Sequence, residues 1–538
     1  MTHRSRRDFL KQLSAFSSLG AASTLGVSLS SMTDAAAQAA PADYRALVCI
    51  FMFGGNDAFN TVLATDSASW GHYLNHRDPR IRNPQDTTSQ SIALMAPGVL
   101  PVSSAPGTTP ERLGGVLPIG HVQRTPHTTR SFALHPALVD VQRLYGDGRV
   151  AVLANVGPLL GPTLKQDWLD SRIAKPAKLF SHNDQQSTWQ SFGTEGTTEG
   201  WAGHMGDVLR TLNGAGHPSA NLIQRSFTCM TPNGSSVWLG GAQVLPFQTG
   251  TTGLSGLGSG SNTYGSAQLQ TALSNIMSGA ASTSDFVKDH QDLVKRGMQA
   301  NTLIGSTLPG FATLPWGTVG NTNAYNEPKL KYRSPVDGTD KFNNLALQLQ
   351  MVARLIDTNR RAGLGIKRQF FMVGFGGFDT HDKQIAAHAE AMAQLNHAMK
   401  YFDDTLKTMP VSGDISSQVT TFTASDFGRT FTNNGDGTDH GWGAHHFIMG
   451  GAVNGNEVYG SFPEYSTADS KGVFASANQI QNGILLPTTS VDHYAYALGR
   501  WMGVPDGTLV NAGNNAVSIL PNLANFPSAG RDLGFMKA

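Results

Sequence analysis

The pattern of hydrophobic and polar positions predicts two series of strands and helices. The first series starts with "YRALVCIFMF" (44–53), which is apolar almost throughout, as is typical of a central strand covered on both faces. A helical pattern follows at 135–148, and a second apolar run ends at Gly157. These segments predict a strand, helix, strand unit and hence a parallel sheet.

The second series occupies the later part of the chain. Segment 343–363 has the pattern of a helix with arginines in its last turn, as a helix C-terminus prefers. The runs at 367–375 and 417–425 predict strands, and the apolar positions within 385–406 predict an amphipathic helix between them. Together the two series predict one doubly wound, mostly parallel α/β domain over residues 40–538.

Residues 213–326 interrupt this alternation. The segment is polar and rich in Gly, Ser and Thr. A flexible linker is one interpretation, and an insertion or cap over the sheet is the other. Short apolar pieces keep returning within the segment, which favours the insertion or cap.

The first 39 residues have the pattern of a twin-arginine export signal. "SRRDFLK" (5–11) precedes a weakly hydrophobic stretch rich in Ala, Ser and Gly, and small-residue cleavage sites lie near Ala37 and Ala39. A basic amphipathic first helix is the alternative interpretation. The signal predicts export through the twin-arginine translocation machinery, which would be a partner during export, and a periplasmic or extracellular location.

Composition excludes several classes of partner. The 39 Lys and Arg against 38 Asp and Glu give a net charge of +1, so we expect no nucleic-acid partner. Beyond the leader no apolar run reaches the ~18 residues that span a bilayer, so no membrane span is expected in the mature protein. Cys49 and Cys229 are the two cysteines, and we predict no disulfide between them.

Polar side chains follow three of the predicted strands. Asp57 follows the first strand, Asp379 and His381 follow the third, and Asp426 and Arg429 follow the fourth. Ligands collect at the carboxyl ends of the parallel strands of such sheets. We therefore expect these side chains to share one edge of the sheet.

A glycine-rich segment supplies more candidate metal ligands. "SDFGRTFTNNGDGTDHGWGAHH" (425–446) contains Asp439, His440, His445 and His446, and its glycines allow the backbone to fold tightly around an ion. Mixed Asp and His ligands suit zinc or manganese, with calcium and magnesium as further candidates. The sequence thus predicts a divalent metal site.

Several candidates have a structural alternative. Asp57 and Asp426 each occupy a position suited to a helix cap. Arg429 suits a bidentate contact to an anionic substrate and equally a structural salt bridge. Strand alternation would direct only one of His445 and His446 towards the site.

The segment "KLFSHNDQQSTWQSFG" (178–193) provides Ser181 and His182 at the start of a helix-like turn. A hydroxyl or imidazole at a helix N-terminus near a metal is an activated nucleophile. A capping serine is the alternative.

Five motifs together resemble a known family. They are "FGGNDAFNTV", "LFSHNDQQSTWQ", "FDTHDKQ", "TASDFGRTFTNNGDGTDHGWGAHHFIMGGAVNG" and "LPTTSVDHYAYALGRWMGV". With the twin-arginine leader, they resemble an uncharacterised bacterial family, domain of unknown function fifteen-hundred-and-one. That family looks like a distant branch of the alkaline phosphatase and sulfatase superfamily.

The resemblance implies an alkaline-phosphatase-like mixed α/β sheet whose site holds one or two divalent metals. It implies these metal ligands: Asp57, Asp379, His381, Asp426, and His440 or His445. Ser181 or His182 would lie near the nucleophile helix, and Phe427 stands where a histidine or asparagine is expected.

The leading hypothesis is an exported metal-dependent hydrolase that acts on a small anionic ester, either a phosphate or a sulfate. The alternative is a non-catalytic periplasmic or surface protein for binding or assembly. A carbohydrate-modifying enzyme would share the same site and differ only in substrate.

Overall fold

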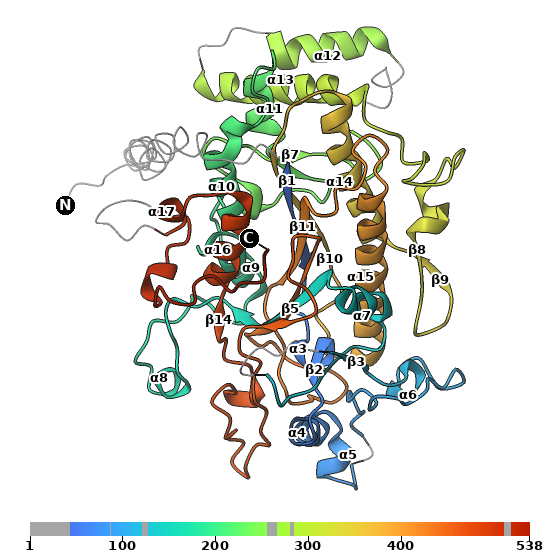
Figure 1. Ribbon diagram of the computed structural model, residues 1–538, viewed down its shortest axis with the longest axis vertical. Coiled ribbons are helices and arrows are strands. Elements are labelled where there is room, and N and C mark those ends of the chain that lie inside the picture. The colour runs from blue at the N-terminus through green and yellow to red at the C-terminus, as the bar shows by residue number, and fades with distance from the viewer. Residues whose placement is uncertain are drawn as a thin grey trace, which may run out of the picture.

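The computed structural model (Figure 1) provides the fold of most of the chain. It describes residues 44–86, 88–120, 127–254, 266–279, 284–510 and 518–537. The predicted export signal at residues 1–39 lies outside the described residues.

A nine-stranded sheet forms the centre of the described structure. Its strands are β1 (Arg45–Met52), β5 (Val150–Gly157), β6 (Cys229–Thr231), β7 (Phe247–Gln248), β10 (Arg368–Phe375), β11 (Val419–Ser425), β12 (Ala444–Met449), β13 (Val458–Tyr459) and β14 (Thr489–Ser490). Their order is β13-β5-β12-β11-β1-β10-β6-β7, and β14 also pairs with β5. The strands predicted at the start of the chain and at 367–375 and 417–425 are confirmed, and they lie side by side as β11, β1 and β10.

The sheet is mixed rather than wholly parallel. β1 pairs in parallel with both β10 and β11, whereas β12 is antiparallel to both β11 and β5. The glycine-rich segment between β11 and β12 contains no helix, and a strand that returns from a loop without a helical crossover runs antiparallel. The prediction of a mostly parallel sheet is therefore confirmed, and β12 is its antiparallel strand.

Helices cover both faces of the sheet (Figure 1). The helices α14 (Asn344–Arg361), α15 (Gln384–Lys407) and α7 (Val139–Gly146) lie on one face, and α9 (His182–Ser191), α10 (Trp201–Leu209) and α16 (Val491–Met502) lie on the other. Alternate residues of β1 enter two different cores: Val48 and Ile50 in one, Leu47, Cys49 and Phe51 in the other. A strand buried on both faces reads as a continuous apolar run, which explains why the sequence pattern identified it.

The polar segment 213–326 contributes to the sheet as well as to an outer layer. Its strands β6 and β7 extend the sheet in parallel beyond β10. Its helices α11 (Ala220–Ser226), α12 (Ala267–Gly279) and α13 (Asp285–Gly305) lie at one end of the molecule, at the top of Figure 1. The segment thus forms one edge of the sheet through β6 and β7, and its helices form an outer layer.

Smaller elements complete the fold. Two minor sheets contain β2 (Val62–Ala64), β3 (Leu117–Ile119) and β4 (Phe132–Leu134), and β8 (Lys331–Arg333) and β9 (Asp340–Phe342). The short helices are α3 (Ala58–Thr61), α4 (Ser67–Arg77), α5 (Pro79–Arg82), α6 (Pro110–Leu113), α8 (Lys165–Leu169) and α17 (Asp506–Leu509). The 3₁₀ turns are η1 (Arg210–Leu212), η2 (Val237–Leu239), η3 (Ala324–Asn326), η4 (Pro328–Leu330), η5 (Gln481–Gly483) and η6 (Leu523–Asn525).

Two further expectations concern cysteines and membranes. Cys49 and Cys229 are both buried free thiols. This agrees with the prediction that they form no disulfide. Within the described ranges, no helix combines the length and the apolar character needed to cross a membrane.

Candidate metal centre

The carboxyl ends of β1, β10 and β11 meet at one edge of the sheet, because these three neighbours are parallel. Asp379 lies shortly after β10, and Asp426 follows β11 directly. Helix α9 begins at the same edge with His182, which contacts both carboxylates. The expected convergence of strand-end side chains is therefore present for Asp379 and Asp426.

Three side chains form a cluster with metal-ligand chemistry. One ligand atom from each of His182, Asp379 and His440 lies within 4.8 Å of the corresponding atoms of the other two. Nε2 of His182 is 3.5 Å from Oδ2 of Asp379, and Nε2 of His440 is 3.3 Å from Oδ1 of Asp379. Two imidazole nitrogens and a carboxylate oxygen are a donor set that zinc and manganese accept.

The outer nitrogens of both histidines are held by other groups. Nδ1 of His182 is 2.7 Å from Oδ2 of Asp426, and Nδ1 of His440 is 2.7 Å from the carbonyl oxygen of Phe180. Each acceptor places a proton on Nδ1 and leaves the lone pair of Nε2 directed into the cluster. Partners of this kind orient metal-binding histidines. Nε2 of His182 is buried and, within the described residues, makes no hydrogen bond.

His381 is a fourth member at the rim of the cluster. Its Nε2 lies 3.1 Å from Oδ1 of Asp379 and 3.0 Å from Nε2 of His440. Its Nδ1 is 3.3 Å from Oδ1 of Asp439. The structure thus places Asp439 beside His381 as an orienting partner, at the outer side of the cluster.

Arg429 anchors Asp379 rather than facing solvent. Its buried guanidinium donates to Oδ1 of Asp379 at 3.0 Å, to the carbonyl oxygen and the hydroxyl of Thr438, and weakly to the carbonyl oxygen of Gly54. These contacts occupy both terminal nitrogens and Nε. Of the two interpretations of Arg429, the structure shows the salt bridge, so the predicted substrate contact is corrected to a positioning role.

A hairpin in the glycine-rich segment brings His440 to the cluster. Arg429 and His440 face each other in an antiparallel bridge. A Cβ at Gly441 would lie 2.5 Å from the carbonyl oxygen of Arg429, so the two arms approach closely only because this position is glycine. This packing explains part of the glycine content that the sequence pattern attributed to ion binding.

Charges within the cluster favour an ionised Asp379. Burial alone would raise its pKa, but Arg429 and the neighbouring histidines lower that pKa overall. The hydrogen bond to Asp426 raises the pKa of His182 despite its partial burial. Burial lowers the pKa of His440, which favours the neutral imidazole that a metal requires.

An aromatic wall closes one side of the cluster. Phe427 is buried and packs against the rings of His182 and His440, with ring centroids 4.8 and 4.6 Å apart. A Cβ at Gly55 would lie 2.5 Å from the Phe427 ring. Phe427 thus supplies packing at the position where the resemblance implied a histidine or asparagine.

Asp57 is not part of the cluster, which corrects its predicted role as a metal ligand. Its carboxylate is fully buried and bonds Arg77 in a bidentate pair at 2.5 and 3.0 Å. It also caps α3 through the backbone N–H of Phe59 and accepts a hydrogen bond from Gln384. These donors occupy both oxygens, and the capping alternative is the one the structure shows.

His445 and His446 are also outside the cluster, which corrects both predicted ligands. They lie on opposite faces of β12: His445 stacks on Phe462, and His446 packs against Trp189 and Tyr494. Both are fully buried, and burial lowers the pKa of each to about 3. They are neutral core side chains.

Ser181 and Gln186, on either side of His182, have different roles. The hydroxyl of Ser181, one of the two candidate nucleophiles, donates to Oδ2 of Asp184 at 2.8 Å and does not cap α9. Gln186, which the sequence analysis did not single out, donates to Oδ2 of Asp426 at 2.9 Å. Gln186 follows His182 by one helical turn, so the two side chains lie on the same face of the helix. That spacing is the sequence signal that could have identified Gln186.

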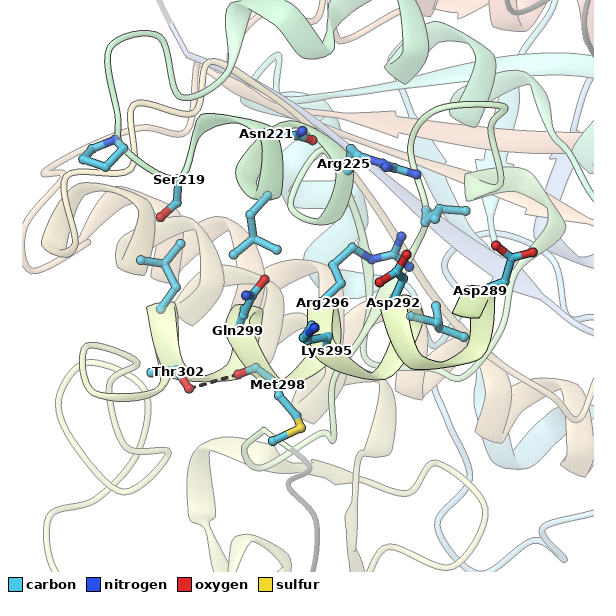
Figure 2. Close-up of a pocket in the computed structure, with 15 residues that line it drawn as sticks. Ser219, Asn221, Arg225, Asp289, Asp292, Lys295, Arg296, Met298, Gln299 and Thr302 are labelled. Carbon is cyan, nitrogen blue, oxygen red and sulfur yellow. Dashed lines mark hydrogen bonds between the residues drawn. The ribbon is translucent and has the colours of Figure 1, made fainter. Parts of the chain in front are cut away.

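A wide groove lies elsewhere, apart from the cluster. It is a groove of about 1280 Å³ between α11 and α13 (Figure 2). Three basic and two acidic side chains line it: Arg225, Lys295, Arg296, Asp289 and Asp292. None of the clustered ligands borders this groove. We assign the candidate site to the His182, Asp379 and His440 cluster because convergent ligand atoms are a more specific chemical feature than volume.

One known family matches part of the chain. A family described as "Protein of unknown function (DUF1501)" matches residues 341–512. The matched region includes Asp379, His381, Asp426 and His440, whereas His182 precedes it. No curated protein matches the chain.

Proposed function

We propose that this protein is an exported, metal-dependent hydrolase of phosphate or sulfate esters, with an alkaline-phosphatase-like version of the α/β fold. The observation that carries the proposal is the convergence of Nε2 of His182, Asp379 and Nε2 of His440 at the carboxyl edge of the sheet. The twin-arginine pattern of the leader supports export and a periplasmic or extracellular location.

The chain's own residues would hold the metal in a defined way. His182, Asp379 and His440 would be ligands, and His381 is placed to be a fourth. Asp426 and the Phe180 carbonyl fix the two imidazoles, and Arg429 fixes Asp379. A bound divalent cation would supply Lewis-acid chemistry to the ester.

The start of α9 suits an anionic ester. His182 is the first residue of this ten-residue helix, and helix N-termini stabilise negative charge. An ester group at the cluster would therefore face both the helix N-terminus and the metal. Phe427 covers one side of the site and limits access of water there.

Metal analysis combined with a substrate screen tests the proposal. Protein purified from the exported fraction is expected to contain a divalent metal and to hydrolyse an aryl phosphate or an aryl sulfate. Asp379→Ala and His440→Ala should lose metal and turnover, whereas His290→Ala, at an exposed position on α13, should retain both. Absence of both bound metal and turnover in the unmodified protein would overturn the proposal.

A second candidate function is non-catalytic binding or assembly. The groove between α11 and α13 favours it, because that cavity is larger than any space beside the cluster among the described cavities. Leu293, half-exposed in the groove, provides the test. If Leu293→Glu abolishes the cellular phenotype while Asp379→Ala preserves it, binding is the function.

A further inference from the structure

A smaller pocket shares one lining residue, Gln186, with the hydrogen bonds that surround the metal cluster. It has a volume of about 420 Å³, within the ~300–1,000 Å³ range of small-molecule sites. Its lining comes from the end of β1, from α9 and from the loop after β6. It therefore opens near the same edge of the sheet as the candidate metal centre.

Two contacts connect this pocket to the cluster. Gln186 lines the pocket and donates to Oδ2 of Asp426, the oxygen that orients His182. Phe53 also lines the pocket, and the next residue, Gly54, donates its backbone N–H to the same oxygen at 3.3 Å. The pocket and the cluster are thus connected through Oδ2 of Asp426.

The lining combines polar side chains with the apolar side chains of Phe53, Val237 and Met372, and it carries no charged side chain. It offers amides and hydroxyls: Gln186, Gln190, Thr197, Thr198, Asn233, Ser235 and Ser236. An amide both donates and accepts, and so does a hydroxyl. A charged group here would lose its hydration without gaining a partner, whereas sugar hydroxyls match both kinds of group.

Some of these groups are already engaged, and others are available. Oε1 of Gln190 accepts hydrogen bonds from the backbone of Trp238 and the hydroxyl of Ser236, which fixes the wall. Within the described part of the chain, the side chains of Asn233 and Ser235 make no hydrogen bond to protein. The half-buried ring of Phe53 gives an apolar surface for the carbon face of a sugar ring.

We propose that this pocket binds an uncharged sugar residue, so that the ester substrate is a sugar phosphate or sugar sulfate. The ester part of this inference rests on the proposed hydrolase function. The sugar part rests on the pocket alone. Asn233 and Ser235 are specificity-determining residues in this arrangement, and Gln186 links sugar binding to the orientation of His182.

Binding and turnover are measured separately. Neutral methyl glycosides of glucose, galactose and N-acetylglucosamine are the binding probes, with saturation-transfer NMR as the readout. Sugar 6-sulfates and 6-phosphates are compared with the matching aryl esters for turnover. Asn233→Leu and Ser235→Ala should weaken glycoside binding about tenfold or more, the usual effect of losing a ligand hydrogen bond in a site.

The same variants should raise KM for the sugar ester more than KM for the aryl ester, because only the sugar ester presents hydroxyls to Asn233 and Ser235. Asn221→Leu is the control, because it makes the same exchange at an exposed position in the groove of Figure 2. It should change neither glycoside binding nor KM for the sugar ester. Ser235 is exposed, so Ser235→Ala remains informative if Asn233→Leu fails to fold.

The outcomes separate the two proposals. Turnover of aryl esters without glycoside binding, and without preference for sugar esters, would overturn the sugar pocket and leave the hydrolase in place. Glycoside binding that depends on Asn233 in a protein without any turnover would support the pocket and overturn the hydrolase.

Discussion

Nδ1 of His182 lies 2.7 Å from Oδ2 of the fully buried Asp426. The contact joins the start of α9 to the end of β11, two elements that are far apart in the sequence. It determines which nitrogen of His182 faces Asp379. In the proposed metal centre, Asp426 would therefore act by orienting His182 rather than by direct contact with the metal.

Asp426→Asn tests this indirect role. The amide keeps the size of the side chain but removes the negative charge that holds the Nδ1 proton of His182, so zinc affinity should fall about 10–100-fold. Competition with a chromophoric chelator measures the affinity. Asp340→Asn, an exposed exchange on β9, should leave zinc affinity unchanged. Equal affinities of both variants and the parent protein would contradict the role of Asp426.

The buried pair of Asp57 and Arg77 should be structural. Arg77→Met leaves the Asp57 carboxylate buried without its cation, and loss of one partner of such a pair costs about 3–5 kcal/mol in the free energy of unfolding. The metal content should not change. The exposed pair of Arg80 and Asp78 provides the comparison, since Arg80→Met should cost less than about 1 kcal/mol.

Urea unfolding and metal analysis of both variants check this prediction. A loss of bound metal in folded Arg77→Met protein would return Asp57 to the list of ligands.

Gly54→Ala should damage both stability and the site. Gly54 has φ = +117°, and a Cβ there would lie 2.4 Å from the backbone nitrogen of Asp379. The backbone strain alone costs about 1–3 kcal/mol, and the clash would displace Asp379. Thermal unfolding and zinc titration are the measurements.

Gly71→Ala is the matched control, because Gly71 lies in α4 with open space around it. Alanine there should stabilise the helix by up to about 1 kcal/mol. Equal stability of the two alanine variants would show that the approach of Gly54 to Asp379 is not a constraint.

Asp492 should make stability depend on pH. Burial raises its pKa to about 7, although Asn522 opposes the shift with hydrogen bonds. Between about pH 4 and pH 7 the carboxyl is protonated in the folded protein and ionised in the unfolded chain, so the folded state binds more protons and stability falls as pH rises. The loss is at most about 1.4 kcal/mol per pH unit.

Asp492→Asn removes this titration. The stability of the variant relative to the parent protein should therefore increase from pH 4 to pH 7 and then level off. Urea unfolding at several pH values measures the difference. A difference that stays constant with pH would show that Asp492 is ionised in the folded protein.

The sequence identified the central strands but not all the roles of the polar residues. β1, β10 and β11 were predictable because burial on both faces produces apolar runs that are visible locally. The direction of β12 was not predictable, because the same apolar pattern fits a parallel and an antiparallel strand. His445 and His446 resembled ligands in the sequence, whereas their burial in two cores makes them neutral packing residues.

By itself, the sequence determined the α/β alternation, the parallel core strands and the presence of Asp379 and Asp426 at their ends. Those features depend on local periodicity and on the rule that parallel strands end at one edge. The tertiary structure alone decided that His182 and His440 join Asp379 while Asp57 pairs with Arg77. The reason is that a carboxylate takes its role from the donors that packing places around it, and those donors come from distant parts of the chain.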